Sequence, residues 1–421
     1  MVLAGALSLA GCGSRGLPGF VSAPGIQDIS VSASHQLVLM TDATVGSRGD
    51  NPHGELGNGT NSPTTQFDRV RGLSDVVAVA AGSLTVYSMI STLSSPFQGS
   101  LKNGNSTTTA FSLAIRKDGT VWAWGANDHG QLGDGSKNDR NIPAQVKNLA
   151  DVTAISAGEG FALALRTDGT VWAWGANDDA QLGNGSKEDS STPVQVKSLT
   201  NVRAISAGGS FGVALRSDGT VWQWGLNNMG DSTPNGKTTY WGVGPGKNRW
   251  NPVPIEVADI SDVLAIAAGS FHCVALERNG TVWAWGATHD LFSGGEAPDS
   301  TVPVRFGEFS DATAIAAAGG ASLALRRDGT MWGWGDNRSG QLGDGTHVYR
   351  ESPVMAKNIE GVTKLFAGEF YTLARAKDQS IWGWGDNHHN PAGGDAPRES
   401  FTETPTRLDA MSNVVISAIS R

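Results

Sequence analysis

The octapeptide DGTVWAWG at 118–125 recurs along the chain with few changes, and this repetition decides the fold. Related stretches begin at residues 168, 218, 279, 328 and 378, so successive copies start 50, 50, 61, 49 and 50 residues apart. A seventh copy, DATVGSRG at 42–49, lacks both tryptophans and starts 76 residues before the next one. Self-similarity with a period of roughly 20–50 residues is typical of solenoids and propellers. The sequence therefore predicts seven copies of one structural unit.

Each copy has the pattern of four short antiparallel strands. Before the copy at 168–175, the apolar run VTAISAG at 152–158 is followed by an alternating run, FALALR at 161–166. An Asp-Gly pair leads into the tryptophan strand, and Asp-Gly between such runs is the strongest short-range signal of a hairpin. The run PVQVKSL at 193–199 supplies the fourth strand. No helical periodicity of useful length is present, so we predict an all-β, seven-bladed β-propeller.

Twelve of the 14 tryptophans stand in pairs such as Trp122 and Trp124. Residues two apart on a strand point to the same face, so both indoles lie on one side and Ala123 lies on the other. One indole can bury about 150–250 Å² of surface. Large side chains on one face and small ones on the other suit stacked blades. We therefore interpret the pairs as the core between blades and not as a stacking platform for a ligand.

Eight segments resemble the first strand of a blade, which is one more than seven blades need. Two of them stand at the ends of the chain, ISVSAS at 29–34 and NVVISAIS at 413–420. The simplest use of the surplus is closure, in which one terminus supplies a strand to the blade begun by the other and hides an open edge. The sequence does not say which copy is surplus.

The first twelve residues differ from the rest of the chain. The run VLAGALSLA at 2–10 is apolar, is too short to span a bilayer as a helix, and leads into Cys12. Small residues before a cleavage point indicate an export signal, and the LAGC tetrapeptide resembles the lipobox of bacterial lipoproteins. We expect Cys12 to be lipidated, residues 13–27 to be a flexible tether, and residues 28–421 to form the propeller. The alternative is a chance apolar N-terminus with an ordinary buried cysteine.

The tandem pattern resembles the regulator of chromosome condensation repeat. It combines ISAG, (F/H)xLAL, DGTVWxWG, a Pro-Val strand and a loop such as NDHGQLGDG at 127–135. The resemblance covers about residues 28–420 and implies a seven-bladed propeller of that type. The founding member is a guanine-nucleotide exchange factor that binds chromatin. The net charge of -9, the lack of a basic block and the export signal oppose both that activity and nucleic-acid binding.

The sequence offers little chemistry beyond the repeats. Its eight histidines are scattered over the blades, and the common hydrolase, metalloprotease and phosphate-binding motifs are missing. The adjacent pair His388 and His389 is a possible metal site, but neighbours on a loop need not point the same way. Asn, Asp and Gly in the loops lack the ordered acidic pattern of a calcium loop and more often serve turn geometry. We expect no catalytic residue, no metal and no cofactor.

Two insertions interrupt the period. The first, at about 84–109, adds 26 residues, including the candidate binding residue Phe97, and looks like a hairpin projecting from the ring. The second, at about 229–251, contains the candidate binding residues Tyr240, Trp241, Lys247, Arg249 and Trp250. Aromatic and basic side chains on a long loop are typical of a binding surface. A loop that packs its own aromatics on the rim would have the same composition.

These features predict a non-catalytic interaction module of the cell envelope that binds a protein partner through one rim. By the same reasoning the protein is exported and lipid-anchored to a bacterial membrane, the outer one where the cell has two. A glycan-binding propeller is the alternative, because exposed Trp and Tyr side chains stack on sugar faces. A polysaccharide-acting enzyme is a third possibility. It would require His, Tyr, Arg or carboxylate groups with shifted pKa values in one concavity.

Overall fold

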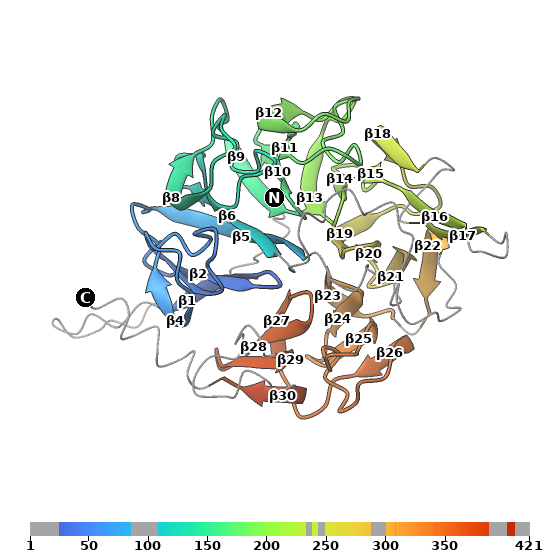
Figure 1. Ribbon diagram of the computed structural model, residues 1–421. Coiled ribbons are helices and arrows are strands. Elements are labelled where there is room, and N and C mark those ends of the chain that lie inside the picture. The colour runs from blue at the N-terminus through green and yellow to red at the C-terminus, as the bar shows by residue number, and fades with distance from the viewer. Residues whose placement is uncertain are drawn as a thin grey trace.

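The computed structural model describes residues 25–85, 108–232, 238–242, 249–287, 300–307, 309–386 and 402–408. Within these ranges, seven four-stranded antiparallel sheets surround a central axis, as Figure 1 shows. The predicted all-β, seven-bladed propeller is confirmed. None of the described residues forms a helix long and apolar enough to cross a membrane.

Each blade takes its strands in chain order, from the innermost strand to the outermost. Blade 1 contains β1 (Ile26–Val31), β2 (His35–Met40), β3 (Val45–Gly49) and β4 (Thr64–Arg69), and blade 2 contains β5 (Val76–Thr85), β6 (Thr108–Arg116), β7 (Val121–Gly125) and β8 (Arg140–Gln145). Blade 3 contains β9 (Val152–Ala157), β10 (Phe161–Arg166), β11 (Val171–Gly175) and β12 (Ser190–Gln195). Blade 4 contains β13 (Val202–Ala207), β14 (Phe211–Arg216), β15 (Val221–Leu226) and β18 (Trp250–Glu256), with β16 (Asn228–Ser232) and β17 (Thr238–Gly242) as an added hairpin.

The last three blades follow the same order. Blade 5 contains β19 (Val263–Ala268), β20 (His272–Glu277), β21 (Val282–Gly286) and β22 (Ser300–Phe306). Blade 6 contains β23 (Ala312–Ala318), β24 (Ala321–Arg326), β25 (Met331–Gly335) and β26 (Arg350–Met355). Blade 7 contains β27 (Val362–Ala367), β28 (Tyr371–Ala376), β29 (Ile381–Gly385) and β30 (Thr402–Arg407).

The Asp-Gly pairs form the tight turns between the second and third strands. In blade 3, the Thr170 amide donates to Asp168 Oδ1 at 3.0 Å, and this bond holds the turn. Gly169 has a φ of +77°, a conformation that L side chains rarely adopt. The hydrogen bonds from Thr170 also lower the pKa of the exposed Asp168 carboxyl. The hairpin expected from the sequence is confirmed.

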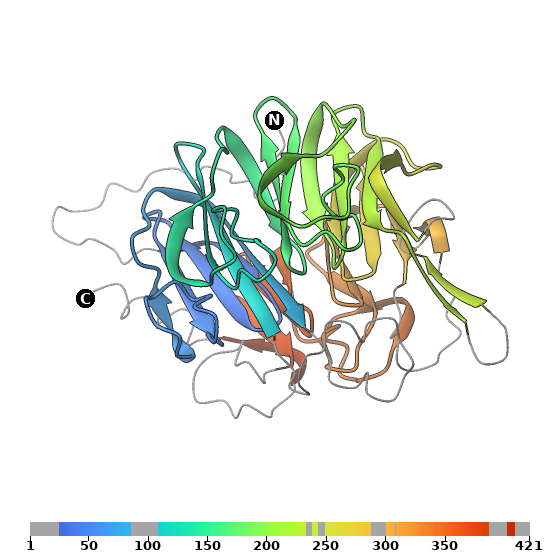
Figure 2. The same cartoon turned by 45° about the horizontal axis from the view of Figure 1, so that its top comes forward.

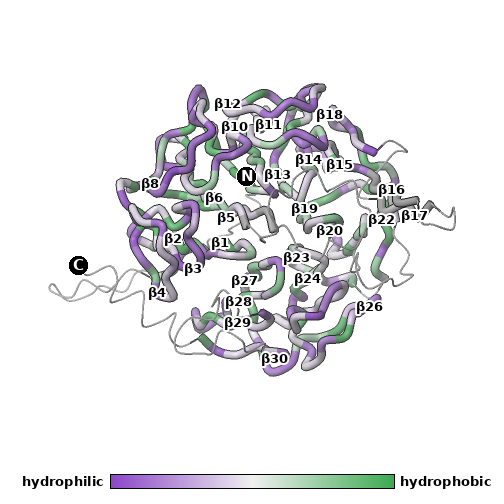
Figure 3. Tube along the Cα trace, in the orientation of Figure 1, coloured by the Kyte–Doolittle hydropathy of each residue, from purple (hydrophilic) through white to green (hydrophobic). Residues whose placement is uncertain are grey.

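The tryptophan pairs form the core between blades, as expected, but the two members lie at different depths. Trp174 of β11 is fully buried among Leu113 and Val121 of blade 2, and its indole N–H donates to the Gln131 carbonyl at 2.9 Å. Trp172 is only half-buried, and its indole N–H donates to the Thr170 hydroxyl at 3.2 Å. Figure 3 shows hydrophilic residues concentrated in the loops and more apolar residues along the strands.

The serine of the ISAG motif joins the innermost strands of adjacent blades. Ser156 Oγ of blade 3 accepts a hydrogen bond from the Ala207 amide of blade 4 at 3.0 Å. Ser206 Oγ accepts in the same way from the Ala268 amide of blade 5 at 3.1 Å. These bonds occupy backbone donors at the crowded centre of the ring, where a small hydroxyl is the side chain that fits.

The ring closes where blade 7 packs against blade 1, and this interface differs from the other six. Arg48 stands where the other blades have the buried tryptophan, and its guanidinium donates to Gln36 Oε1 through Nε at 3.0 Å and Nη2 at 2.9 Å. Gln36 Nε2 donates to the Tyr371 hydroxyl of blade 7 at 3.2 Å. Burial lowers the pKa of Arg48 to about 10. A polar network therefore replaces an indole at the closing interface.

The seven described sheets do not share strands between the two termini. The segment at 29–34 overlaps β1, which is the innermost strand of its own blade, and blade 7 is complete with four consecutive strands. The expectation of a blade shared by both ends was therefore wrong for the described strands. The second candidate, at 413–420, lies outside the described residues, as do the expected signal segment and most of the tether.

Candidate functional site

Chain topology places both insertions on the same face of the ring. In a four-stranded antiparallel blade, the connections from first to second strand and from third to fourth strand leave the same face. The first insertion joins β5 to β6, the first two strands of blade 2, and the second joins β15 to β18, the last two strands of blade 4. We call this surface the loop face. The opposite surface carries the Asp-Gly turns, and we call it the turn face.

The described parts of both insertions are β structure. Strands β5 and β6 stay paired through Thr85 and Thr108, which supports the expected hairpin, although Phe97 lies outside the described residues. The second insertion contains a two-stranded hairpin, β16–β17, at the edge of the ring in Figures 1 and 2. Tyr240 pairs with Gly230 and Trp241 pairs with Met229 in this hairpin. Lys247 lies outside the described residues.

Trp250 lies at the base of the second insertion, where β18 begins. Its half-buried indole lies against two cations, with Lys187 Nζ at 3.7 Å and Arg249 Cζ at 5.5 Å from the ring centroid. Lys187 comes from the neighbouring blade 3, so this contact joins two blades. The sequence analysis identified Trp250 and Arg249 but missed Lys187, which is 63 residues away from Trp250 and has no local signal that points to it.

The loops that carry the GQLG motif are held by a buried asparagine. Asn127 Nδ2 donates to the carbonyls of Ser136 at 3.1 Å and Asn138 at 3.0 Å, and its Oδ1 accepts from the Leu132 amide at 3.0 Å. The asparagines at the same position of the other copies are also fully buried: Asn51, Asn177 and Asn337. These contacts give the asparagines a structural role in loop geometry. Among the described residues, no three His, Cys, Asp or Glu side chains could hold a metal ion, and His388 and His389 lie outside them.

Histidines of the loop face connect adjacent blades. The ring nitrogen Nδ1 of His53 lies 2.7 Å from Asp139 Oδ2, and Nδ1 of His129 lies 3.1 Å from Asp189 Oδ2 in the equivalent place one blade further on. The hydrogen bond to Asp189 raises the pKa of His129. Because each carboxylate belongs to the next blade, these pairs stabilise the packing of neighbouring loops. Nothing in this arrangement requires a ligand.

Loops of the loop face also meet at the central axis. The Glu159 amide donates to the Gly209 carbonyl at 3.1 Å, and the Gly209 amide donates to the Ser270 carbonyl at 3.2 Å. Burial and, to a lesser extent, the charge of Glu369 raise the pKa of Glu159 to about 8, although a hydrogen bond from Ser270 opposes the shift. Glu159 and Glu369 belong to blades 3 and 7, on different sides of the ring, so their carboxyls come close only at the axis.

Comparison with known families agrees with this geometry. The regulator of chromosome condensation (RCC1) repeat matches residues 118–165, 168–215 and 328–375. A second description of the same repeat matches residues 152–181, 202–231, 263–289 and 312–341. The chain belongs to the regulator of chromosome condensation repeat family. The matched ranges fall in blades 2 to 7, where the tryptophan pairs are intact, and do not include the degenerate first copy.

Curated relatives of this repeat protein match it only in part. The probable E3 ubiquitin-protein ligase HERC3 of Homo sapiens is 32% identical over 139 residues, which is 32% of this chain and 11% of the relative. The E3 ubiquitin-protein ligase HERC2 of Homo sapiens is 28% identical over 158 residues, which is 30% of this chain and 3% of the relative. The chain therefore spans about a tenth or less of the length of these relatives.

Solved structures show the same propeller at low sequence identity. Prp20p of Saccharomyces cerevisiae has a TM-score of 0.67 and 22% identity, over 90% of this chain and 87% of that one. Human WBSCR16 has a TM-score of 0.67 and 18% identity, over 87% of this chain and 93% of that one. At these identities the likeness shows the fold of this repeat protein and no more.

Proposed function

We propose that this propeller is a non-catalytic interaction module that binds a protein partner through the loop face. The observation that carries the proposal is topological. The chain has two long insertions in an otherwise regular ring, and both leave the ring on one face. Long insertions on a rigid scaffold are where proteins commonly place their binding residues. The rest of the loop face is stabilised by contacts between its own loops, so the insertions are the parts that distinguish this propeller.

The comparisons support a protein as the partner class. The solved structure of Prp20p was described together with its binding to Gsp1p and histones, and another structure shows the yeast protein bound by Kap60. The contacts of Trp250 also favour a protein over a glycan at this position. Its ring already lies against Lys187 and Arg249, so a sugar would have to displace a cation before it could stack.

The binding role of the second insertion is tested by the triple variant Tyr240→Ala, Trp241→Ala and Trp250→Ala. We expect a pull-down with this variant to lose the partner that the wild-type chain recovers, because interface energy concentrates in a few aromatic anchors. The matched control is Lys117→Ala, Arg327→Ala and Lys377→Ala, three exposed residues of the turn face. Unchanged recovery by the aromatic variant, with both variants folded by circular dichroism, would remove this site.

We also propose that the protein is anchored to a bacterial membrane through Cys12. The support is the LAGC tetrapeptide after an apolar run and the Gly-, Pro- and Ser-rich segment that follows it. Stable anchoring takes two membrane signals, and a doubly acylated cysteine supplies them. We expect Cys12→Ser to move the protein from the membrane fraction to the soluble fraction on cell fractionation. If the variant stays in the membrane fraction, the protein is held there in some other way.

A further inference from the structure

The outermost strand of each blade has one edge with no partner strand in the described sheets. In blade 3, the Val196 amide donates inward to the Val171 carbonyl at 2.9 Å. Pro193, three residues earlier, lies at the register irregularity between the paired residues Val194 and Ser190 of this strand. Proline has no N–H and offers no donor to an arriving strand, which is a common protection of sheet edges. Six blades have proline at this position: Pro143, Pro193, Pro254, Pro303, Pro353 and Pro405.

Strand β4 of blade 1 lacks this protection. The Val70 amide donates to the Val45 carbonyl at 3.0 Å, so the residue equivalent to the prolines is Phe67. The Phe67 ring is buried at the interface with blade 7, with the Arg48 guanidinium 4.4 Å from its centroid. Its side chain therefore serves the closing interface, and the N–H of Arg69, next to the inward-pointing Val70 amide, faces outward. Among the seven outer strands that the structure describes, β4 alone has a residue with a backbone N–H at this position.

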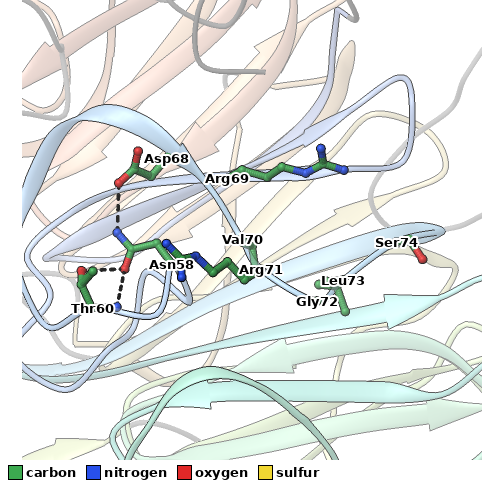
Figure 4. Close-up of a pocket in the computed structure, with 9 residues that line it drawn as sticks. All are labelled: Asn58, Thr60, Asp68, Arg69, Val70, Arg71, Gly72, Leu73 and Ser74. Carbon is green, nitrogen blue, oxygen red and sulfur yellow. Dashed lines mark hydrogen bonds between the residues drawn. The ribbon is translucent and has the colours of Figure 1, made fainter. Parts of the chain in front are cut away.

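An open hollow of about 700 Å³ lies beside the end of this strand, as Figure 4 shows. Its lining includes the exposed Arg69 and Arg71, and neither guanidinium pairs with a carboxylate in the described part of the chain. Asp68 also lines the hollow, but Asn58 Nδ2 donates to its carboxylate at 3.0 Å. The charged side chains of the hollow therefore sum to a net positive charge beside the end of β4.

In the described part of the chain, loops of a preceding blade contact the beginning of the next outer strand. The Gly135 amide donates to the Ser191 carbonyl at 2.9 Å, and the Gly345 amide donates to the Glu403 carbonyl at 2.9 Å. Both acceptors come two residues before the proline position. Contacts of this kind leave the end of the outer strand uncovered in blades 3 and 7, and Arg69 at the end of β4 is exposed.

We propose that the outer edge of β4 binds an extended acidic segment of a partner protein as an added strand. The backbone of Phe67 and Arg69 would pair with the segment, and Arg69 and Arg71 would bind its carboxylates. A second copy of this chain is a poorer occupant. Antiparallel pairing of β4 with another β4 would bring the arginines of both copies together, and like charges across a strand pair are destabilising. This site is separate from the insertions of the loop face.

The probe is a fluorescein-labelled mixture of decapeptides with Glu at alternate positions and Val, Thr or Tyr between them, titrated with the full chain. We expect a rise in fluorescence anisotropy, and at least tenfold weaker binding by the Arg69→Glu, Arg71→Glu variant. The matched control is Arg305→Glu, Lys357→Glu, which changes the charge equally beside β22 and β26, where the prolines are present. This control should bind within twofold of wild type.

A second pair of probes tests strand addition itself. In an added strand, alternate N–H groups of the peptide face β4 and the others face solvent. N-methylation of the set that faces β4 removes the hydrogen bonds to the edge, whereas N-methylation of the other set changes only groups that face solvent. We expect one set to lose binding at least tenfold and the other to retain it. Equal binding by both sets, no binding at all, or equal loss by the two charge variants would overturn the proposal. Binding only after removal of residues 409–421, or a wild-type dimer abolished by Arg69→Glu, Arg71→Glu, would assign the edge to this chain itself.

Discussion

Replacement of Trp174 by alanine should lower the free energy of unfolding by about 3–5 kcal/mol, the usual range for a large aromatic side chain removed from a core. Trp174 is fully buried between blades 2 and 3, and its indole N–H donates to the Gln131 carbonyl. The variant leaves both a cavity and a carbonyl that has lost a donor. Urea unfolding followed by tryptophan fluorescence and circular dichroism measures the loss.

The matched control is Trp172→Ala, two residues away on the same face of the same strand. Trp172 is half-buried and its indole N–H donates to the Thr170 hydroxyl at the end of the turn. We expect this variant to lower the free energy of unfolding by about 1 kcal/mol. Trp172 buries less apolar surface than Trp174, and the Thr170 hydroxyl can form a hydrogen bond with water once the indole is gone. Equal losses for the two variants would mean that the inner tryptophans do not form the main contact between blades.

A second large effect is expected from Glu55→Gln, and it should depend on pH. Glu55 occupies the position of Gln131, Gln181 and Gln341 in other copies, and its side chain is fully buried. Burial raises its pKa to about 7, although hydrogen bonds from the backbone amides of Glu55 and His53 oppose the shift. The folded protein thus holds this proton more tightly than the unfolded chain. The stability contributed by the carboxyl is present below pH 4.5 and is lost as pH rises to about 7.

The difference in stability between the Glu55→Gln variant and wild type should therefore grow in favour of the variant, by about 2–3 kcal/mol from pH 4.5 to pH 8. Urea unfolding at the two pH values measures it, and other titrating groups cancel because both proteins contain them. The reciprocal control, Gln131→Glu, should introduce the same pH dependence into blade 2. A pH-independent difference would show that the Glu55 carboxyl is ionised in the folded protein at neutral pH.

The regular part of the fold could be predicted because each copy repeats its own local signals. Asp168 and Gly169 form the expected turn, and the spacing of Trp172 and Trp174 predicts their shared face. Which of the two is more deeply buried could not be predicted, because depth depends on how far each indole lies from the turn face once the neighbouring blade is in place. That distance is a property of the assembled ring and not of one repeat.

The degenerate first copy was the harder part to interpret. The loss of both tryptophans at 42–49 was visible, but its consequence depends on contacts between the two ends of the chain. Arg48 reaches Tyr371 through Gln36, and Phe67 fills the same interface from β4. The sequence already shows phenylalanine in blade 1 at the position where the other six blades have proline. Its meaning became clear only when the structure showed which backbone groups face outward.

The candidate site shows the same division between local and long-range information. The second insertion was predicted from its length and aromatic content, and the structure places its hairpin and Trp250 on the loop face. The contact of Trp250 with Lys187 joins two blades and could not be inferred from spacing. The axial approach of Glu159 and Glu369 likewise depends on ring closure, because the two residues are 210 positions apart.

The central claim, that a protein partner binds the loop face, is tested most directly by amide hydrogen exchange of the chain with and without its captured partner. We predict slower exchange in β16 and β17 and in the loops at 127–135 and 177–185, with unchanged exchange in the turns at 117–119 and 327–329. The turns at 117–119 and 327–329 lie on the turn face. Protection of those turns, with no change in β16 and β17, would contradict the account.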